Sequence, residues 1–373
     1  MKPLSVHLEP AWHITGPTGQ PLPARAMFWL AEVERHGSLS AACKAAGASY
    51  RHTWSLLEES EAAMGAPLVV KARGKGSQLT ALGQALVWAQ RRFEARLRPQ
   101  LDSVAFELQA ELHRVLSDVA RPLRVFASHG FAIEVLQRLL TEADTPLEWR
   151  YTDSSQALAA LRAGLADVAS LHLPIGPLQA SVLRHHARCL DPDWLYVHMV
   201  TRRQGLMVKA GNPLHIDGLT DLLRPDVRFV ARAQGSGTRL LLETLLQARG
   251  LDPSAVSHGP TGEHTHSAIA AYVASGMADV GFGVETSARR FGLEFIPVQT
   301  ECYGLLMPPG VRASPAADTL ITLLQSPACQ ALLQRLEGYR PDRCGEVTPA
   351  RACFEAWAEA ARTAPPAAPW SGL

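Results

Sequence analysis

The chain has 373 residues, a hydrophobic fraction of 47% and a formal net charge of +1, and this length allows two or three globular domains. No apolar run is long enough to cross a bilayer, and the first ten residues lack the apolar core of a signal peptide. We therefore expect a cytoplasmic protein with no membrane partner. The six cysteines show no CxxC pair and no zinc-ligand spacing, which indicates reduced thiols and no metal site.

Positive charge is concentrated in one segment. Residues 25–100 hold 11 Lys and Arg against 6 Asp and Glu, whereas the rest of the chain holds 25 against 29. A local basic excess favours contact with nucleic-acid phosphates, and the acidic remainder is not expected to touch DNA.

The first elements are short. Residues 4–23 alternate apolar and polar side chains around Gly-Pro and Gly-Gln turn signals, which predicts a short strand pair. Residues 24–36 predict an amphipathic helix with Leu30 and Val33 facing inward. Cys43 lies on the apolar face of the next helix and is expected in the core.

Residues 37–54 carry the most informative motif, which predicts two short helices joined by a tight turn at Gly47. Ser38 or Ser40 caps the first helix, and Ser49 caps the second. The first turn of the second helix holds four residues with long, flat or polar side chains: Tyr50, Arg51, His52 and Thr53. Such side chains suit a recognition helix in a DNA major groove. The alternative is a plain helical hairpin.

Residues 68–80 predict a strand, a basic glycine-rich loop and a second strand, followed by a helix from Ala81. The loop carries Lys71, Arg73 and Lys75, which would lie against phosphates or in a minor groove. This order of elements is that of a winged helix-turn-helix. The alternative for the loop is a solvated hairpin tip.

Residues 27–98 resemble the N-terminal DNA-binding domain of the molybdate-responsive ModE regulators, relatives of the LysR type. The resemblance rests on the segments Glu34-Arg-His-Gly-Ser-Leu-Ser-Ala-Ala, Ala48-Ser-Tyr-Arg-His-Thr-Trp and Leu79-Thr-Ala-Leu-Gly-Gln. It implies a DNA-binding dimer in which Trp54 and Leu57 pack inward. The family's pair of small β-barrel molybdate modules has no counterpart in the remaining residues. The predicted DNA contacts are Ser38, Ser49, Tyr50, Arg51, His52, Thr53, Lys71, Arg73 and Lys75.

The helix from Ala81 continues to about Leu112. Its apolar stripe consists of Phe93, Leu97, Leu101, Val104, Leu108 and Leu112. A stripe this long exceeds what a small winged domain buries, so the same helix of a second subunit is the expected partner, in a homodimer or tetramer. Pro99 predicts a kink or break. The alternative is that the stripe packs on the chain's own C-terminal domain.

From Arg121 strands and helices alternate with short loops, which predicts α/β architecture with a mostly parallel sheet. The pattern occurs twice, with crossings near 199–202 and 298–303, as in a two-lobed type II periplasmic-binding-protein-like domain. The predicted fold is α/β with an N-terminal winged helix-turn-helix and a linker helix. The predicted boundaries are 1–98 for the winged domain, 99–120 for the linker, 121–345 for the two-lobed domain (lobe I about 121–200 and 300–345, lobe II about 201–299) and 346–373 for a disordered tail.

A second resemblance covers about 220 residues. It rests on Gly235-Ser-Gly-Thr-Arg239, His264-Thr-His-Ser-Ala-Ile-Ala-Ala271 and Ser275-Gly-Met-Ala-Asp-Val-Gly-Phe-Gly-Val-Glu285. These segments resemble the PBP-like domain that is joined to molybdopterin-biosynthesis proteins and to some ModE-type and LysR-type regulators. The resemblance implies a sensor of molybdate, tungstate or a metabolite of a molybdoenzyme pathway.

Four polar loops fall where strands end and helices begin, the usual ligand position in α/β sheets. Hydroxyls and free N–H groups at helix N-termini hold small anions, although each Ser or Thr taken singly is more simply a helix cap. Neutral donors suit a tetrahedral oxyanion such as molybdate or tungstate, whereas Arg232 and Arg239 leave formate as the carboxylate alternative. The predicted ligand-binding residues are Ser128, His129, Ser154, Ser155, His172, Ser236, Gly237, Thr238, Arg239 and Thr265.

No enzyme is expected, because Ser128–His129 and Cys302 lack the setting of a nucleophile. His129, His172, His264 and His266 lack metal-ligand spacing and are better explained as polar donors, so no cofactor is predicted. The sequence predicts a one-component transcriptional regulator that binds a double-stranded DNA operator. The alternative from another class is an accessory ligand-binding protein of molybdenum cofactor metabolism whose winged domain binds protein.

Overall fold

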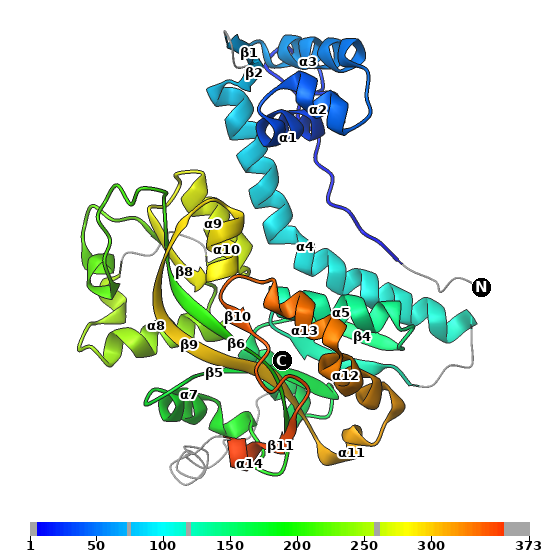
Figure 1. The fold of residues 1–373 in the computed structure, drawn as a ribbon, viewed down its shortest axis with the longest axis vertical. Helices are drawn as coiled ribbons and strands as arrows, with labels where there is room; N and C mark the ends of the chain where they lie inside the picture. The colour runs from blue at the N-terminus through cyan, green and yellow to red at the C-terminus, as the bar shows by residue number, and fades with distance from the viewer. Residues whose placement is uncertain (1–5, 73–75, 117–120, 257–261, 354–373) are drawn as a thin grey trace. The chain divides into compact units, whose positions relative to one another are not determined.

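The computed structural model describes residues 6–72, 76–116, 121–256 and 262–353 (Figure 1). The chain divides into two compact units, residues 9–98 and a larger unit of residues 6–8 together with residues from 99 onward. Residues 6–8 differ from the predicted boundary, since the Val6 N–H donates to Gln109 Oε1 at 3.2 Å in the larger unit. Arg73, Lys75, the predicted linker residues 117–120 and the tail beyond Cys353 lie outside the described residues.

The smaller unit contains three helices, an antiparallel hairpin and the start of a long helix, in the order that the sequence predicts. Ser38 accepts the Ala41 N–H at 3.2 Å and Ser49 accepts the His52 N–H at 3.5 Å, so both serines cap their helices. The core includes Trp29 and Leu57, and Cys43 is buried as expected. The elements are α1 (Ala26–His36), α2 (Leu39–Ala45), α3 (Tyr50–Met64), β1 (Val69–Ala72), β2 (Gly76–Leu79) and α4 (Ala81–Leu116).

The predicted strand pair at 4–23 is wrong. Within the described part of this segment the pairing is a single isolated bridge between Thr15 and Pro21. Proline has no N–H to donate to a strand ladder, and four of the residues from 10 to 23 are prolines. The segment instead packs through Gly16, where a Cβ would come within 1.9 Å of the Ala63 carbonyl oxygen at the end of α3.

The long helix α4 runs without interruption through Pro99, so the predicted break is absent. In the larger unit Ala105 is buried and Phe106 packs against the core. The stripe residues Val104, Leu108 and Leu112 are exposed instead. One face of the helix therefore packs against its own unit, and a second apolar face is exposed. Among the described helices, none is both long and apolar enough to span a membrane.

The described part of the larger unit is built on a nine-stranded sheet with the order β4-β3-β5-β9-β6-β8-β7, and β10 and β11 also pair with β6. Strand β3 is parallel to β4 and β5, and β7 is parallel to β8. The strands are β3 (Leu123–Ala127), β4 (Leu147–Tyr151), β5 (Val168–Pro174), β6 (Leu195–Val208), β7 (Phe229–Val230), β8 (Val280–Val284), β9 (Glu294–Met307), β10 (Tyr339–Arg340) and β11 (Val347–Pro349).

Helices flank the sheet and bury apolar faces such as that of α5, which includes Ile133, Leu136 and Leu140. The α-helices are α5 (Phe131–Glu142), α6 (Ser154–Arg162), α7 (Gln179–His186), α8 (Gly237–Gln247), α9 (His266–Ala274), α10 (Glu285–Arg290), α11 (Pro309–Arg312), α12 (Pro315–Gln325), α13 (Pro327–Gln334) and α14 (Ala350–Cys353). Three 3₁₀ turns are also found in the described residues: η1 (Ala187–Cys189), η2 (Leu219–Leu223) and η3 (Pro253–Ala255).

Two 14-residue strands connect the lobes. Strands β6 and β9 are antiparallel from the pair Leu195–Met307 to the pair Val208–Glu294, and they run side by side through both lobes (Figure 1). Strand β5 is antiparallel to its neighbour β9, and β8 is antiparallel to its neighbour β6. The prediction of a mostly parallel sheet is therefore wrong, because the shared centre is antiparallel and only the flanking strands are parallel.

The predicted disordered tail begins too early. Strand β11 pairs with β6, and Ala350 at the start of α14 is fully buried. Residues 347–353 thus belong to the folded unit.

Candidate functional site

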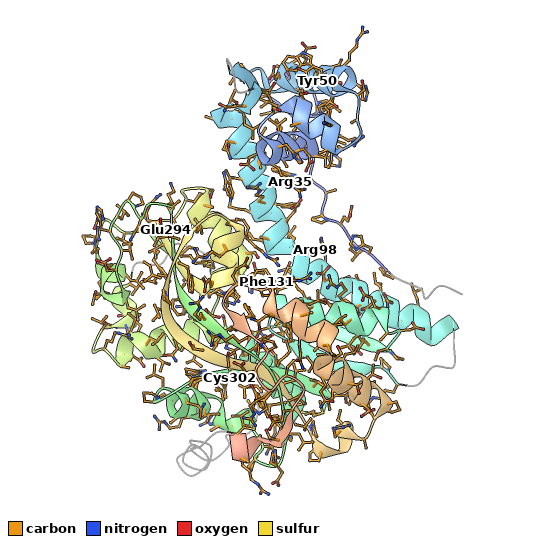
Figure 2. The ribbon with its side chains drawn as sticks, in the orientation of Figure 1. Arg35, Tyr50, Arg98, Phe131, Glu294 and Cys302 are labelled. Atoms are coloured by element: carbon orange, nitrogen blue, oxygen red, sulfur yellow. The ribbon has the colours of Figure 1, made fainter. Side chains whose placement is uncertain are left out.

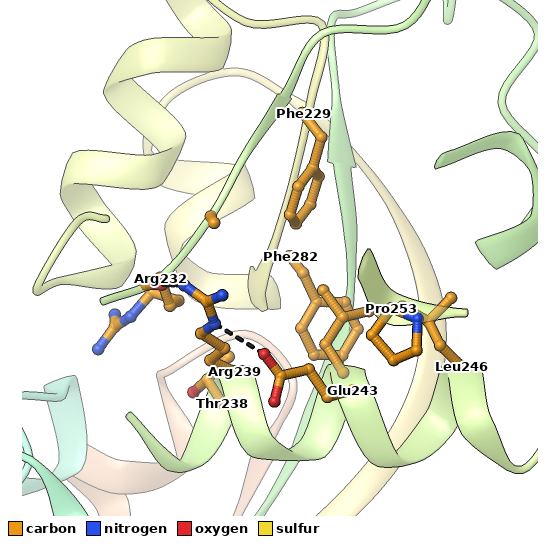
Figure 3. Close-up of a pocket in the computed structure, with 10 residues that line it drawn as sticks. Phe229, Arg232, Thr238, Arg239, Glu243, Leu246, Pro253 and Phe282 are labelled. Atoms are coloured by element: carbon orange, nitrogen blue, oxygen red, sulfur yellow. Dashed lines mark hydrogen bonds and ion pairs between the residues drawn. The ribbon is translucent and has the colours of Figure 1, made fainter. Parts of the chain in front are cut away.

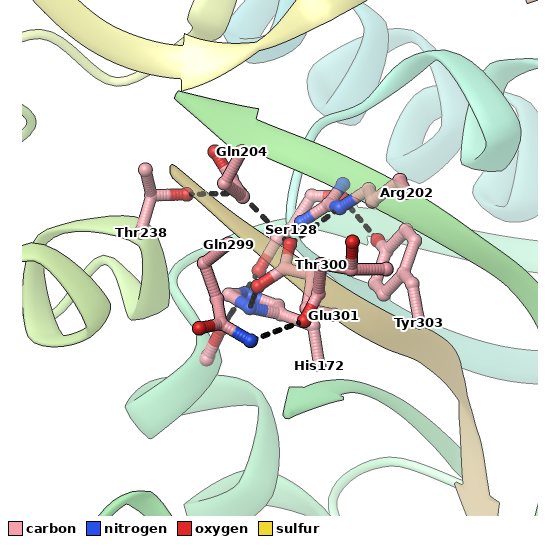
Figure 4. A network of polar contacts seen from close by, with 10 residues as sticks. Ser128, His172, Arg202, Gln204, Thr238, Gln299, Thr300, Glu301 and Tyr303 are labelled. Carbon is pink, nitrogen blue, oxygen red and sulfur yellow. Dashed lines mark hydrogen bonds and ion pairs between the residues drawn. The ribbon is translucent and has the colours of Figure 1, made fainter. Parts of the chain in front are cut away.

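The centre of the larger unit, where β6 and β9 pass between the lobes, carries three buried polar side chains (Figure 4). The Arg202 Nε donates to Glu301 Oε1 at 2.6 Å, and the Gln204 Nε2 donates to the same oxygen at 2.8 Å. Burial alone would raise the pKa of Glu301, but the positive charge of Arg202 and the hydrogen bonds with His172 and Gln204 lower it to about 2. Glu301 is therefore a fixed carboxylate at the crossing of the two strands.

A chain of hydrogen bonds leads from Glu301 into lobe I. The His172 Nδ1 lies 3.3 Å from Glu301 Oε2, and the His172 Nε2 lies 3.0 Å from Ser154 Oγ. Ser154 Oγ lies 3.0 Å from Ser128 Oγ. His172 and Ser154 are buried, whereas Ser128 is half-buried at the outer end. We name Ser128, Ser154, His172 and Glu301 the serine–histidine relay.

Lobe II meets this relay through the first turn of α8. A Cβ on Gly237 would come within 2.3 Å of the His172 Cε1, so only glycine allows this approach. The Gln204 Nε2 lies 3.4 Å from Thr238 Oγ1. Ser236, the N-cap residue of α8, is buried, and its side chain makes no cap hydrogen bond. The structure thus brings Ser128, Ser154, His172 and the 236–238 loop together at one place, between the lobes.

Arg232 adds a buried positive charge beside α8 (Figure 3). Its side chain is 7% exposed, and its Nε and Nη1 atoms have no hydrogen-bond partner among the described residues. Burial lowers the pKa of Arg232 to about 9, with a further lowering by Arg202 and an opposing effect of Glu263. A buried cation with free donors favours an anion as its missing partner.

An apolar pocket lies against α8 (Figure 3). Its apolar side includes Phe229, Leu246 and Phe282, and Arg239 and Glu243 lie at its polar side. The Arg239 Nε donates to Glu243 Oε1 at 2.8 Å, and its Nη1 donates to the Arg232 carbonyl oxygen at 3.3 Å. Arg239 therefore helps to hold the loop in place, and its role as a ligand contact stays a prediction.

Other predicted ligand residues are used differently. Thr265 is fully buried, and its Oγ1 accepts the Ala268 N–H at 2.9 Å, so it caps α9 rather than facing a ligand. His129 Nε2 lies 3.0 Å from Glu134 Oε1. Ser155 is half-buried in the first turn of α6. By contrast, His266 is not among the predicted ligand residues, although its Nδ1 is buried without a hydrogen-bond partner in the described part of the chain and burial holds its pKa well below the usual value.

Arg202, Gln204, Glu301 and Arg232 form the charged centre, yet none is among the predicted site residues. The sequence signal that could have found them is a charged or amide residue next to an apolar run. Arg202, for example, closely follows the mainly apolar stretch 194–200. Charges are almost never fully buried unless they are paired or functional, so such interruptions mark a site.

The relay has the connectivity of a serine–histidine–carboxylate triad, but its serine is poorly placed for nucleophilic attack. Ser154 is 1% exposed, and Ser128 Oγ lies 3.0 Å from its oxygen. A substrate carbonyl would need to replace Ser128 to reach Ser154. The relay is therefore better suited to binding than to covalent catalysis.

In the smaller unit, the start of α3 presents the predicted DNA-contact residues to solvent. Ser49, Tyr50, Arg51 and His52 are exposed, and Tyr50 is labelled on α3 in Figure 2. Thr53 is 1% exposed and its Oγ1 donates to the Ser49 carbonyl oxygen at 3.0 Å, so the predicted DNA contact of Thr53 is wrong.

Three further residues concern the same surface. Ser38 is half-buried at the start of α2, where a Cβ on Gly76 of the hairpin would come within 2.6 Å of the Ser38 Cβ. Lys71 lies in β1. Trp54 is half-buried and stacks on Tyr50 with ring centroids 6.1 Å apart, and its indole N–H donates to Glu58 Oε1 at 2.7 Å.

The fold and this interlobe arrangement define a two-lobed α/β binding domain. A profile of the PBP superfamily domain matches residues 137–325, half of the chain, and the chain therefore belongs to the PBP superfamily.

The chain is similar to three named proteins. It is 29% identical over 263 residues to the uncharacterized protein YvgK of Bacillus subtilis (strain 168), covering 69% of this chain and 83% of that protein. It is 31% identical over 122 residues to the molybdenum-pterin-binding protein MopB of Rhodobacter capsulatus, covering 32% of this chain and 44% of that protein. The solved structure of full-length LysG from Corynebacterium glutamicum has a TM-score of 0.40 and 18% identity, covering 86% of this chain and 100% of that one.

Proposed function

We propose that this protein is a one-component transcriptional regulator of the LysR-related, ModE-like type, which binds a small anion between the lobes of its PBP-like domain and a DNA operator with its smaller unit. Such a regulator works in the cytoplasm. The observation that carries the sensor half is the Arg232 guanidinium, buried beside the first turn of α8 with two nitrogens that have no partner among the described residues. An anion would supply hydrogen-bond acceptors for these two nitrogens.

The position of the site supports a small ligand. Gly237 of lobe II and His172 of lobe I are already so close that a Cβ does not fit between them. Donors at the start of α6 and α8 lie beside the same place, and helix N-termini favour anions. The space and the donors together favour a compact oxyanion.

Molybdate or tungstate is the proposed effector. Serine hydroxyls and helix N–H groups are neutral donors that suit a tetrahedral oxyanion, and the similarity to the molybdenum-pterin-binding protein MopB supports molybdenum chemistry. Formate is the second candidate, and a specific observation favours it: Arg232 supplies the guanidinium that a carboxylate prefers. Isothermal titration of the full chain with molybdate, tungstate, sulfate and formate separates these candidates, and no heat with any of them would contradict the sensor half.

The DNA-binding half rests on the start of α3. Exposed Tyr50, Arg51 and His52 follow the Ser49 cap, in a segment with an excess of positive charge. Side chains at the N-terminal end of a recognition helix reach base edges, and Lys or Arg on the following hairpin reaches phosphates. The predicted contacts of Lys71, Arg73 and Lys75 remain part of this proposal. Gel-shift titration with promoter fragments at low salt tests it, because an accessory protein without DNA function would not shift them.

The exposed stripe on α4 supports a homodimer. Val104, Leu108 and Leu112 lie four residues apart, so they share one face of the helix. A second copy of α4 would bury this face. Sedimentation of the full chain tests the proposal, and a monomer at micromolar concentration would contradict it. A signal from the sensor would reach the DNA-binding unit through α4, the element that both units share.

A further inference from the structure

The serine–histidine relay is a chain in which each polar atom has a limited number of protons. Its four members are joined by Oγ–Oγ, Oγ–Nε2 and Nδ1–Oε2 distances of 3.0, 3.0 and 3.3 Å. Ser154, His172 and Glu301 are buried, so water does not supply additional donors to them. Only Ser128 is accessible, and it is therefore the end that a ligand meets.

The direction of the hydrogen bonds follows from Glu301. Its Oε1 already accepts N–H groups from Arg202 and Gln204, as a carboxylate does, so Oε2 must accept a proton from the His172 Nδ1. In a neutral imidazole the Nε2 is then an acceptor, and Ser154 must donate to it. Ser154 in turn accepts the only proton of Ser128. With His172 neutral, Ser128 thus shows only lone pairs to the space between the lobes.

This arrangement repels an anion, which needs donors. We infer that anion binding at this site is coupled to the uptake of one proton by His172, an inference that rests on the proposed anion site. A proton from water on Nε2 makes His172 a donor to Ser154, Ser154 then donates to Ser128, and Ser128 donates to the anion. One proton thus reverses the direction of both hydrogen bonds that the two hydroxyl groups make, and no bond between heavier atoms changes.

The charges around His172 permit this protonation. Glu301 on β9 is negative and Arg202 on β6 is positive, so that pair is neutral as a whole. The ring of Tyr303 on β9 lies edge-on, with centroids 5.7 Å apart. Burial lowers the pKa of His186 on α7 to about 3 and holds that of His266 on α9 well below its usual value, so neither is charged near neutral pH. Neighbouring α6 and α8 contribute Ser154 and Gly237, which are uncharged.

The coupling fixes the sign of the pH dependence. Since the complex holds one proton more than the free protein, raising the pH weakens binding, by up to tenfold per pH unit. The coupling applies to fully ionised oxyanions, because a ligand that brings its own hydroxyl would find Ser128 as an acceptor and would need no proton.

Calorimetric titration of the full chain at pH 7–9 tests the inference, with molybdate as the first probe and formate as the second. Repeating the titration in buffers of different ionisation enthalpy gives the number of protons taken up. About one proton per bound anion is expected. H172Q has no titratable group at this position, so the anion binding that remains should show no proton uptake and no pH slope. H264Q, at an exposed histidine, should behave as the wild type.

The outcomes separate the inference from the proposed function. Anion binding without proton uptake in the wild type would overturn the inference and leave the anion site standing, and so would an unchanged pH slope in H172Q. No binding of either probe would overturn both. If H172Q does not fold, S128A provides the test, because it removes the end of the relay: the anion binding that Arg232 retains should show no proton uptake.

Discussion

The Arg202 Nε and the Glu301 Oε1 lie 2.6 Å apart in a fully buried ion pair that joins the two strands shared by both lobes. Arg202 also lies over the Tyr303 ring, 4.2 Å from its centroid. Removing one partner of a buried pair leaves the other charge without compensation. We expect R202M to lower the free energy of unfolding by about 3–5 kcal/mol, measured by urea denaturation. The double variant R202M/E301M should lose less than R202M alone, and equal losses would contradict the pairing.

Acid sensitivity follows from the same carboxylate. The pKa of Glu301 in the folded protein is about 2, below the ordinary value of 4.5, so its ionised form is bound more tightly in the folded state. The resulting stabilisation is complete above about pH 4.5 and is lost as the pH falls from there toward 2. Thermal unfolding between pH 6 and 3 should show a smaller fall of Tm in E301Q than in the wild type. Parallel curves would show that other carboxylates dominate.

Replacing Arg232 should affect anion affinity and the free energy of unfolding to different extents. R232M should weaken anion binding by about a hundredfold or more, because it removes a charge-assisted contact inside a buried site. It should lower the free energy of unfolding less than R202M does, since Arg232 Nε and Nη1 have no hydrogen-bond partner among the described residues. R239M is the matched control, because Arg239 is engaged by Glu243, and its anion affinity should stay within about threefold. A strong loss of anion affinity in R239M, with none in R232M, would show that Arg239 and not Arg232 contacts the anion.

The approach of Gly237 to His172 predicts that side-chain size at this position controls closure. A Cβ 2.3 Å from the imidazole forces the lobes apart or displaces His172. G237A should weaken anion binding by about ten- to a hundredfold, an effect of roughly 1.4–2.7 kcal/mol. G310A serves as the control, because a Cβ at Gly310 meets no described atom within 4 Å. Equal affinities of G237A and wild type would mean that the ligand binds with the lobes further apart.

For the smaller unit the contrast between Arg51 and Thr53 is diagnostic. R51A should weaken operator binding and reduce the slope of log affinity against log salt by about 1, if Arg51 contacts one phosphate. T53V should leave DNA affinity unchanged and lower stability by about 1–3 kcal/mol, because it replaces a buried hydroxyl that bonds to the Ser49 carbonyl. Gel-shift and denaturation series on both variants give these values. A K75A variant extends the test to the predicted hairpin loop. Identical DNA affinities of R51A, K75A and the wild type would show that this surface does not bind DNA.

Local features can be predicted from the sequence because their causes are local. Ser38 and Ser49 cap helices three residues away, and Gly237 starts a helix in a Gly-Ser-Gly-Thr loop, so short patterns suffice. The hairpin after α3 and the alternation of strands and helices after Arg121 are predictable for the same reason.

The centre of the site cannot be predicted in this way. Arg202 and Glu301 are 99 residues apart in the sequence, so no local pattern indicates that their side chains meet. The direction of β6 against β9 depends on the path of the intervening chain between Val208 and Glu294, and alternation of elements does not encode it. Thr53 and Thr265 look like polar contacts in the sequence, but both side chains point into hydrogen bonds of their own helices.

The pairing of Arg202 with Glu301 has a consequence for how such a chain can diversify. These residues mark the points where the polypeptide passes into lobe II and returns from it, and partners in an antiparallel ladder lie only about 5 Å apart. Lobe II is thus an insertion whose two ends lie side by side. If it were removed, a tight turn could connect the two strands of lobe I directly. Exchange of this lobe by recombination would alter ligand choice through Arg232 and the α8 loop while the hydroxyl chain of lobe I stays in place.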